Sequence, residues 1–265
     1  MTTRRRRALV LATAVGAAAA VAACTDLPSS PDEAFSIEFE QLPFPAVVLG
    51  DSLRDSTGTA RPVSATAFNV DGTALPASAV QYLLVGAGAT LLPGNFVRGD
   101  TLDAEVQVRA VAGTLPSLPR ALRVVPRPDS LAGPTTAIPA IEYGLPFSPT
   151  ADRSDPVAVR VLNTADPAAT AAVQSWVVRY RLVIRGDTVP LSDTSLVWLV
   201  DDANRRSAID TTDADGQASR RVRVNGLNPL VDDLDSVVVS VTAQGTRTPL
   251  RGAPLRIALP VRSRP

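Results

Sequence analysis

The 265-residue chain contains no histidine and no lysine, and Cys24 is its only cysteine. Ser-His-Asp triads, Cys-His dyads and Ser-Lys dyads each need a residue type that is missing here. Zinc sites built from histidine and cysteine are excluded for the same reason. A single cysteine also allows no internal disulfide, so the folded body must be stabilised by burying a core.

Motifs of phosphate-binding and hydrolytic enzymes are missing too, because no G-x-S-x-G, G-x-G-x-x-G or P-loop pattern occurs. Paired carboxylates, as in glycosidases, remain chemically available. Most of the aspartates, however, stand beside Thr, Ser, Gly or Asn in stretches typical of turns. We therefore predict no enzymatic activity, no catalytic residue, no metal site and no cofactor.

The charge balance changes when the N-terminus is set aside. The whole chain has 26 arginines and 26 acidic residues, and four of the arginines are Arg4 to Arg7. The remaining body has 22 basic against 26 acidic residues, a net charge of −4. A nucleic-acid-binding protein would show a basic stripe, and none is visible in the sequence. We predict no nucleic-acid partner.

The N-terminus has the layout of an export signal. Arg4 to Arg7 precede an uncharged, alanine-rich run from Ala8 to Ala23. This run is shorter than the roughly twenty residues that a membrane-spanning helix needs. We predict a signal peptide over residues 1–23. A twin-arginine signal would also begin with arginines, but no Phe-Leu follows them, so the export route stays open.

The end of this run, Val21-Ala22-Ala23-Cys24, resembles the lipobox of bacterial lipoproteins. The resemblance implies cleavage before Cys24 and a thioether-linked diacylglycerol on that residue. Several acyl chains on one residue hold a protein stably on a membrane, so the implied partner is a membrane. The alternative is an ordinary signal peptide with a chance cysteine. Residues 24–33 are polar and rich in Pro and Ser, and are predicted to form the lipidated tether.

The resemblance also implies a location. Such a protein is exported and lipid-anchored in the cell envelope. Thr25 is not the aspartate that retains some lipoproteins in the inner membrane. We therefore expect the outer membrane or the cell surface rather than the inner membrane.

From Phe35 onward the hydrophobic period is two. Val106, Val108 and Ala110 alternate with polar residues, and comparable short patterns recur at about ten-residue spacing with turn residues between them. Such spacing indicates a β-sandwich, which we place at residues 34–126. Seven prolines from Pro126 to Pro156 then interrupt regular strand pairing. They mark a linker at the start of a second domain, residues 127–265, whose exact boundary within 127–150 stays open.

The second block alternates more regularly. Val157, Val159 and Val161 share one face of a strand, and Trp176 to Ile184 and Val237 to Ala243 repeat the pattern. One buried and one wet face is typical of antiparallel sheets. Leu255, Ile257, Leu259 and Val261 alternate with Arg256 and Arg262 in the last strand, and Pro254 and Pro260 predict that this strand lies at a sheet edge.

The segment Asp210 to Val224 resembles bacterial Ig-like domains of the invasin/intimin type, which carry a T-D-x-x-G-x-A turn before an alternating strand. Here the matching residues are Thr212, Asp213, Gly216 and Ala218. Glycine suits a turn that needs positive φ, and alternation makes Ala218 the first inward residue. The first block is similar to this group more loosely. The resemblance implies an all-β fold of two tandem Ig-like antiparallel β-sandwich domains after the signal peptide.

Two further patterns each have two interpretations. Arg-Gly-Asp occurs at residues 98–100 and 185–187. Each copy could be an integrin ligand or a turn at a strand junction, and we favour turns because Gly and Asp are common turn residues. Six aspartates could contribute to a calcium site or simply to solvated turns. They are Asp210, Asp213, Asp215, Asp232, Asp233 and Asp235.

These observations predict a non-catalytic cell-envelope lipoprotein that acts as a structural or adhesion module, with an unidentified protein or glycan ligand. The alternative is a carbohydrate-binding or substrate-presenting surface lipoprotein. Sugar sites favour exposed aromatic side chains, and only 4% of the residues are aromatic. Trp198 is the candidate, and its exposure in a groove would favour the alternative.

Overall fold

The computed structural model describes residues 32–39, 41–144, 152–166, 168 and 170–265. The predicted signal peptide, the lipobox residues Val21, Ala22 and Ala23, and Cys24 lie outside the described residues. Within the described residues, strands β1 to β20 account for nearly all regular structure, with two short 3-10 helices. The predicted all-β fold of Ig-like β-sandwich type is confirmed. No described helix has the length and apolar character needed to cross a bilayer.

The described chain divides into two compact units. The smaller unit includes residues 65–81 and 110–117 together with the first strand. Its antiparallel strands are β1 (Ser36–Glu38) and β3 (Thr66–Phe68), and it also holds η1 (Ala77–Ala79) and β8 (Leu115–Pro116). The predicted domain boundary near residue 126 remains a prediction.

The larger unit includes residues 40–64, 82–109 and 118–265. Its N-terminal strands include β2 (Ala46–Val48), which pairs parallel with β9 (Arg120–Val125), while β9 pairs antiparallel with β7 (Glu105–Ala112). A separate hairpin joins β5 (Ala89–Leu92) to β6 (Phe96–Gly99). Alternation operates as expected in β7, where Val106, Val108 and Ala110 are fully buried.

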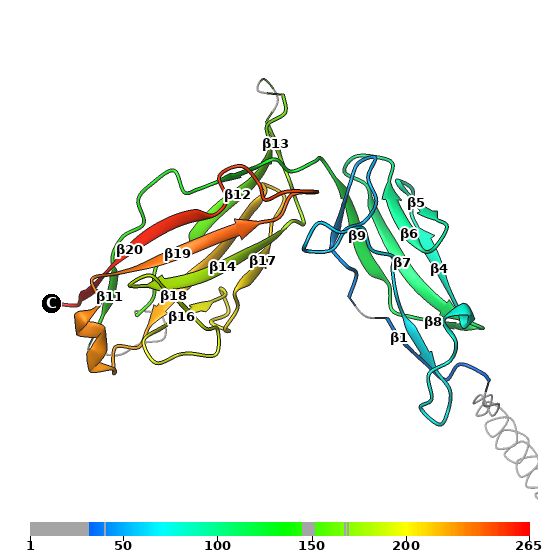
Figure 1. Cartoon of the computed structure of the whole chain (residues 1–265), viewed down its shortest axis with the longest axis horizontal. Helices are drawn as coiled ribbons and strands as arrows, with labels where there is room; N and C mark the ends of the chain where they lie inside the picture. Colours follow the sequence, from blue (N-terminus) through cyan, green and yellow to red (C-terminus); the bar gives the residue numbers. More distant parts are fainter. Residues whose placement is uncertain (1–31, 40, 145–151, 167, 169) are drawn as a thin grey trace, which may run out of the picture. The chain divides into compact units, whose positions relative to one another are not determined.

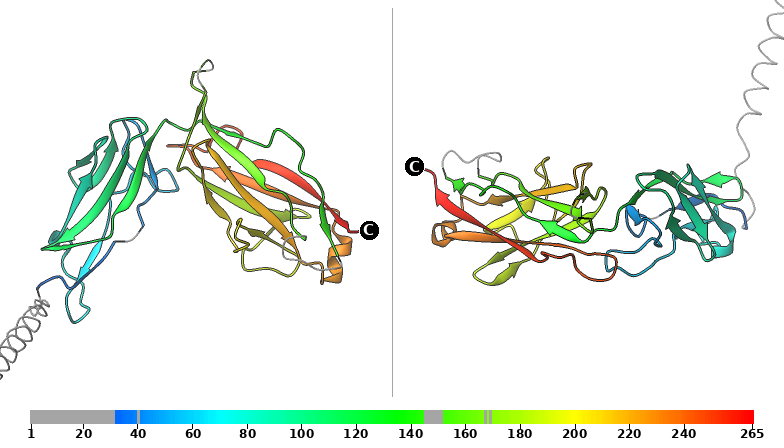
Figure 2. Two further views of the ribbon diagram at one scale, coloured as in Figure 1. Left: turned by 180° about the vertical axis from the view of Figure 1, so that it is seen from behind. Right: turned by 90° about the horizontal axis from the view of Figure 1, so that it is seen from above.

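The C-terminal part of this unit consists of two facing sheets (Figures 1 and 2). One sheet, in the order β10-β12-β18-β16, is formed by β10 (Ser130–Ala132), β12 (Val157–Asn163), β18 (Gln217–Val224) and β16 (Val197–Val200), with β13 (Ala171–Ala172) beside β12. The other, in the order β11-β20-β19-β14-β15, is formed by β11 (Ile141–Tyr143), β20 (Leu255–Ser263), β19 (Ser236–Ala243), β14 (Val177–Ile184) and β15 (Asp187–Val189), with β17 (Ile209–Thr211) also on β14.

Their core comes from the inward residues of each strand, such as Val159 in β12, Val178 in β14 and Val239 in β19, each at most 1% exposed. Burying such side chains contributes about 1.5–3 kcal/mol each. The η2 helix (Pro229–Asp233) connects β18 to β19.

The prediction that the last strand is an edge strand is wrong. β20 lies between β11 and β19. Proline has no backbone N–H group to donate. The sheet accommodates Pro260 because the two neighbouring strands pair with different parts of β20. β19 pairs with Leu255 to Pro260, whereas the β11 pairing begins one residue later, at Val261.

Candidate functional site

The predicted turn motif connects β17 to β18. The Oδ1 atom of Asp213 accepts hydrogen bonds from the backbone N–H groups of Asp215 and Gln217, each at 2.9 Å. Gly216 has a φ of 71°, and a Cβ atom there would lie 2.6 Å from the carbonyl oxygen of Val161. Position 216 therefore requires glycine for two reasons: the backbone has a positive φ there, and a side chain would collide with the backbone of Val161.

Thr212 ties this turn to the chain that enters β14. Its hydroxyl donates to the carbonyl of Val173 at 2.6 Å and accepts from the N–H of Trp176 at 2.8 Å. Thr212 and Trp176 are both buried. In β18 itself, Gln217 is exposed and Ala218 is buried, as alternation predicts. The polar atoms of the motif are thus engaged within the chain.

The two Arg-Gly-Asp segments differ in structure. Arg185 and Gly186, with φ of 51° and 96°, form the turn of the β14–β15 hairpin, as expected. Gly99 instead ends β6 and pairs with Ala89. A Cβ atom on Gly99 would lie 2.8 Å from Val124. The first segment is therefore the end of a strand rather than a hairpin turn. Glycine is favoured at position 99 because a side chain there would collide with Val124.

The six aspartates are not gathered into one site. No group of three or more His, Cys, Asp or Glu side chains among the described residues could hold a metal ion. Asp232 accepts a hydrogen bond from the Tyr143 hydroxyl at 2.8 Å, and Asp210 pairs with Arg220 at 2.9 Å. These two carboxylates therefore act as structural partners.

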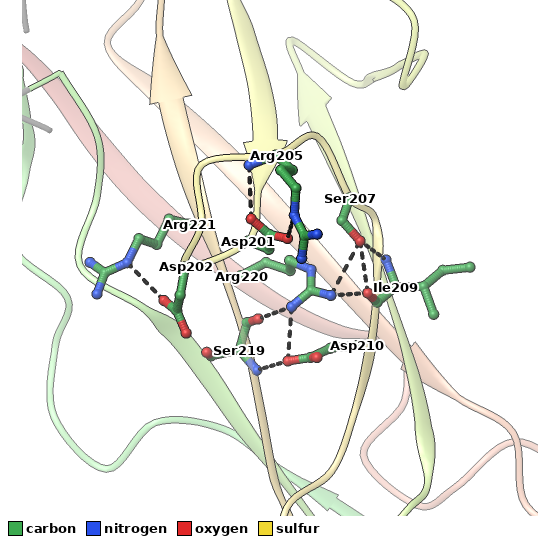
Figure 3. Close-up of polar contacts among 9 residues, drawn as sticks. All are labelled: Asp201, Asp202, Arg205, Ser207, Ile209, Asp210, Ser219, Arg220 and Arg221. Atoms are coloured by element: carbon green, nitrogen blue, oxygen red, sulfur yellow. Dashed lines mark hydrogen bonds and ion pairs between the residues drawn. The ribbon is translucent and has the colours of Figure 1, made fainter. Parts of the chain in front are cut away.

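Arg220 of β18 is a charged residue at a buried, inward position of the C-terminal sheets (Figure 3). Only 10% of its side chain is exposed. Its guanidinium contacts the carboxylate of Asp210, the hydroxyl of Ser207, and the carbonyls of Ile209 and Ser219. Asp210 also accepts the backbone N–H of Ser219 at 2.7 Å. Since β17 and β18 belong to different sheets, this cluster joins the two layers.

Two buried polar atoms near the cluster have no hydrogen-bond partner within the described residues, the Tyr180 hydroxyl and Arg220 Nε. Burial raises the pKa of the Tyr180 hydroxyl far above its usual value, and the Asp210 carboxylate adds to this shift. Tyr180 therefore stays neutral at physiological pH.

The loop between β16 and β17 forms one ion pair within itself and one with β18 (Figure 3). Asp201 accepts the backbone N–H and the Nε–H of Arg205, both at 2.8 Å. The backbone hydrogen bond from Arg205, with its guanidinium adding to the effect, holds the pKa of the Asp201 carboxyl below its usual range. Asp202 reaches Arg221 of β18 at 3.3 Å.

A cavity of about 360 Å³ lies where the edge of β14 changes partner. β17 pairs with Val177 to Arg179, the backbone N–H of Tyr180 donates to the carbonyl of Ala208, and β15 pairs with Leu182 to Ile184, so Arg181 lies between the two partner strands. The lining is mainly apolar and includes Tyr180, Leu182, Pro190, Leu191, Trp198 and Ile209. Predominantly apolar concave sites of this size are typical of small-ligand binding.

Trp198 is half-buried and lines this cavity. The guanidinium carbon of Arg223, from the paired strand β18, lies 5.2 Å from the ring centroid, a cation–π contact. The structure thus places Trp198 in a groove, the observation that favours the carbohydrate-binding alternative.

Sequence reasoning missed Arg220 and the cavity. Arg220 occupies an inward position of the same alternation that buries Ala218, Val222 and Val224. The sequence does indicate Arg220, because a charged residue stands at a position where the alternation predicts an apolar one. The cavity depends on where β15 and β17 end along β14, and no local pattern encodes this.

Comparisons with known proteins give a limited result. No protein-family model matches the sequence, and no curated protein matches it significantly. Solved structures with a similar backbone include the Yersinia pseudotuberculosis adhesin InvE, with 13% identity, a TM-score of 0.32, and coverage of 82% of this chain and 56% of that chain.

A second is the Escherichia coli adhesin FdeC, with 13% identity, a TM-score of 0.29, and coverage of 88% of this chain and 65% of that chain. A third is the S-layer protein rSbsC, with 9% identity, a TM-score of 0.30, and coverage of 89% of this chain and 28% of that chain. The chain thus spans less than two thirds of the length of each. TM-scores this low assign the chain to no family and transfer no function to it.

Proposed function

We propose that the chain is a non-catalytic lipoprotein of the bacterial cell envelope, held to a membrane through acyl chains on Cys24. Its Ig-like body acts as a structural or adhesion module. The lipobox-like segment ending at Cys24 supports the anchor.

The proposed role of the Ig-like body is supported by its buried and partly buried polar residues, which connect separate elements of the fold. Arg220 and Asp210 join the two C-terminal sheets, and Thr212 ties the β17–β18 turn to the start of β14. Hydrogen-bonded ion pairs in partly buried positions fix the relative placement of the layers they connect. A module that transmits force between an anchor and a partner needs such fixed layers.

Attachment of cells tests this proposal. A bacterium expressing the full chain should bind to a partner surface more strongly than one expressing Cys24→Ser, which releases the body from the membrane. Equal attachment, with both proteins found in the membrane fraction, would contradict the proposal.

A carbohydrate-binding function is the second candidate, because Trp198 lines the cavity at the β14 edge. Trp176 is 5% exposed and provides an internal reference. A sugar bound at the cavity should change the fluorescence of the full chain but leave that of Trp198→Phe unchanged. A response that persists in Trp198→Phe would remove this candidate.

A further inference from the structure

The outer face of the sheet that contains β14, β19 and β20 carries three exposed arginines. Arg179 and Arg181 are outward residues of β14, and Arg256 is an outward residue of β20. Arg181 lies opposite Ser240 of β19, which lies opposite Arg256. We call Arg179, Arg181 and Arg256 the arginine face.

Strand geometry sets the spacing of this face. Outward residues two positions apart along a strand are separated by about 7 Å, and residues two strands apart by about 10 Å. The three guanidinium groups are therefore within reach of one extended ligand.

The arginine face has no compensating acid. None of the three side chains forms an ion pair within the described part of the chain, whereas eight other arginines do. The residues paired with Arg179 are Thr242 and Ile209, which are uncharged. The body as a whole carries a net charge of −4 after the signal, so this basic face does not follow from the overall composition.

We propose that the arginine face binds an acidic polysaccharide through its carboxylate or sulfate groups, and that this polysaccharide is the partner in the adhesion role proposed above, on which the inference rests. Guanidinium groups bind such anions with paired hydrogen bonds. The hydroxyls of Ser240 and Thr242 stand between or beside the arginines and can bind sugar hydroxyls.

Features of the surface favour a polysaccharide over other polyanions. Ser240 lies between Arg181 and Arg256, and Thr242 lies beside Arg179, so this part of the face lacks the large apolar anchors of protein interfaces and of membrane-inserting surfaces. Ile209, on the other side of Arg179, is an exposed apolar residue at the edge of the face. The face also carries no aromatic residue on which the bases of single-stranded nucleic acid could stack. Arg179 and Arg181 also line the cavity at the edge of β14, so the arginine face adjoins that cavity.

The test uses the full mature chain in detergent, with polygalacturonate and heparin as the carboxylate and sulfate probes. The triple variant Arg179→Gln, Arg181→Gln, Arg256→Gln is compared with a control that loses the same charge elsewhere, Arg160→Gln, Arg206→Gln, Arg247→Gln. All three control positions are exposed. Both variants should keep the unfolding midpoint of the unmodified chain.

We expect at least one polysaccharide to bind, with affinity falling about tenfold or more, or roughly 1.4 kcal/mol, in the arginine-face variant and little in the control. Higher salt should weaken binding. Equal losses in both variants, or tighter binding to duplex DNA or to vesicles of anionic lipid than to either polysaccharide, would overturn the inference. Cell attachment without polysaccharide binding would overturn it as well, while leaving the adhesion role intact.

Discussion

The carboxylate of Asp210 in β17 lies 2.9 Å from the guanidinium of Arg220 in β18, and this pair connects the two C-terminal sheets. Asp210 is 27% exposed and Arg220 10% exposed at the side chain. The pair is therefore less screened than a surface ion pair, but it is not isolated from water.

Removing one partner should leave a poorly solvated charge. We expect Arg220→Met to lower the free energy of unfolding by about 2–4 kcal/mol, and Asp210→Asn by less, because Ser219 can still donate to the amide oxygen. The double variant should recover about 1 kcal/mol or more of the summed loss. Urea unfolding followed by tryptophan fluorescence measures this, since Trp198 lies in β16 and the buried Trp176 directly precedes β14. Strict additivity would show that the two residues do not interact.

The β17–β18 turn gives a second prediction. Gly216→Val places a β-branched side chain at positive φ and against Val161, and should cost about 1–3 kcal/mol or more. Ala218→Asp buries a charge in the core and should be more severe, whereas the exposed Gln217→Val should stay within about 0.5 kcal/mol. Denaturant midpoints give the order. A larger loss for Gln217→Val than for Ala218→Asp would contradict the observed register.

Thr212→Val tests the tie between the turn and β14. It removes the hydroxyl bonded to Val173 and Trp176, leaving two buried backbone groups without that partner, at a cost of about 1–3 kcal/mol. The neighbouring Thr211 is exposed, so Thr211→Val is the matched control and should be close to neutral. Equal effects of the two substitutions would argue against a structural role of the buried hydroxyl.

Stability should be nearly constant from about pH 5 to pH 9, because histidine, the usual titrating group in that range, does not occur. The Thr57 hydroxyl holds the pKa of Asp55 below its usual value, so this stabilisation is present above about pH 4 and is lost as the pH falls further. Burial raises the pKa of Tyr180, which stabilises the fold below about pH 10 and is lost as the pH rises above it. Melting temperatures from about pH 3 to about pH 11 check the plateau and both losses, and a steep change between pH 5 and pH 7 would contradict the plateau.

Much of the fold follows from local patterns in the sequence. Alternation identified the buried face of β12, β14 and β19, and the T-D-x-x-G-x-A spacing identified a turn that needs a glycine. The position of β20 could not be derived this way, because proline signals a missing donor without showing that β11 can pair beyond it. The arginine face was equally invisible, since Arg256 lies far from Arg179 and Arg181 in sequence and only the register across β19 brings them together.

The central claim is the lipid anchor at Cys24, and mass spectrometry of the N-terminal peptide from the membrane-bound protein tests it most directly. The account predicts a mature chain that begins at Cys24 and carries a thioether-linked diacylglycerol, absent from Cys24→Ser. A mature chain that begins elsewhere, or an unmodified Cys24 in protein recovered from the membrane, would contradict it.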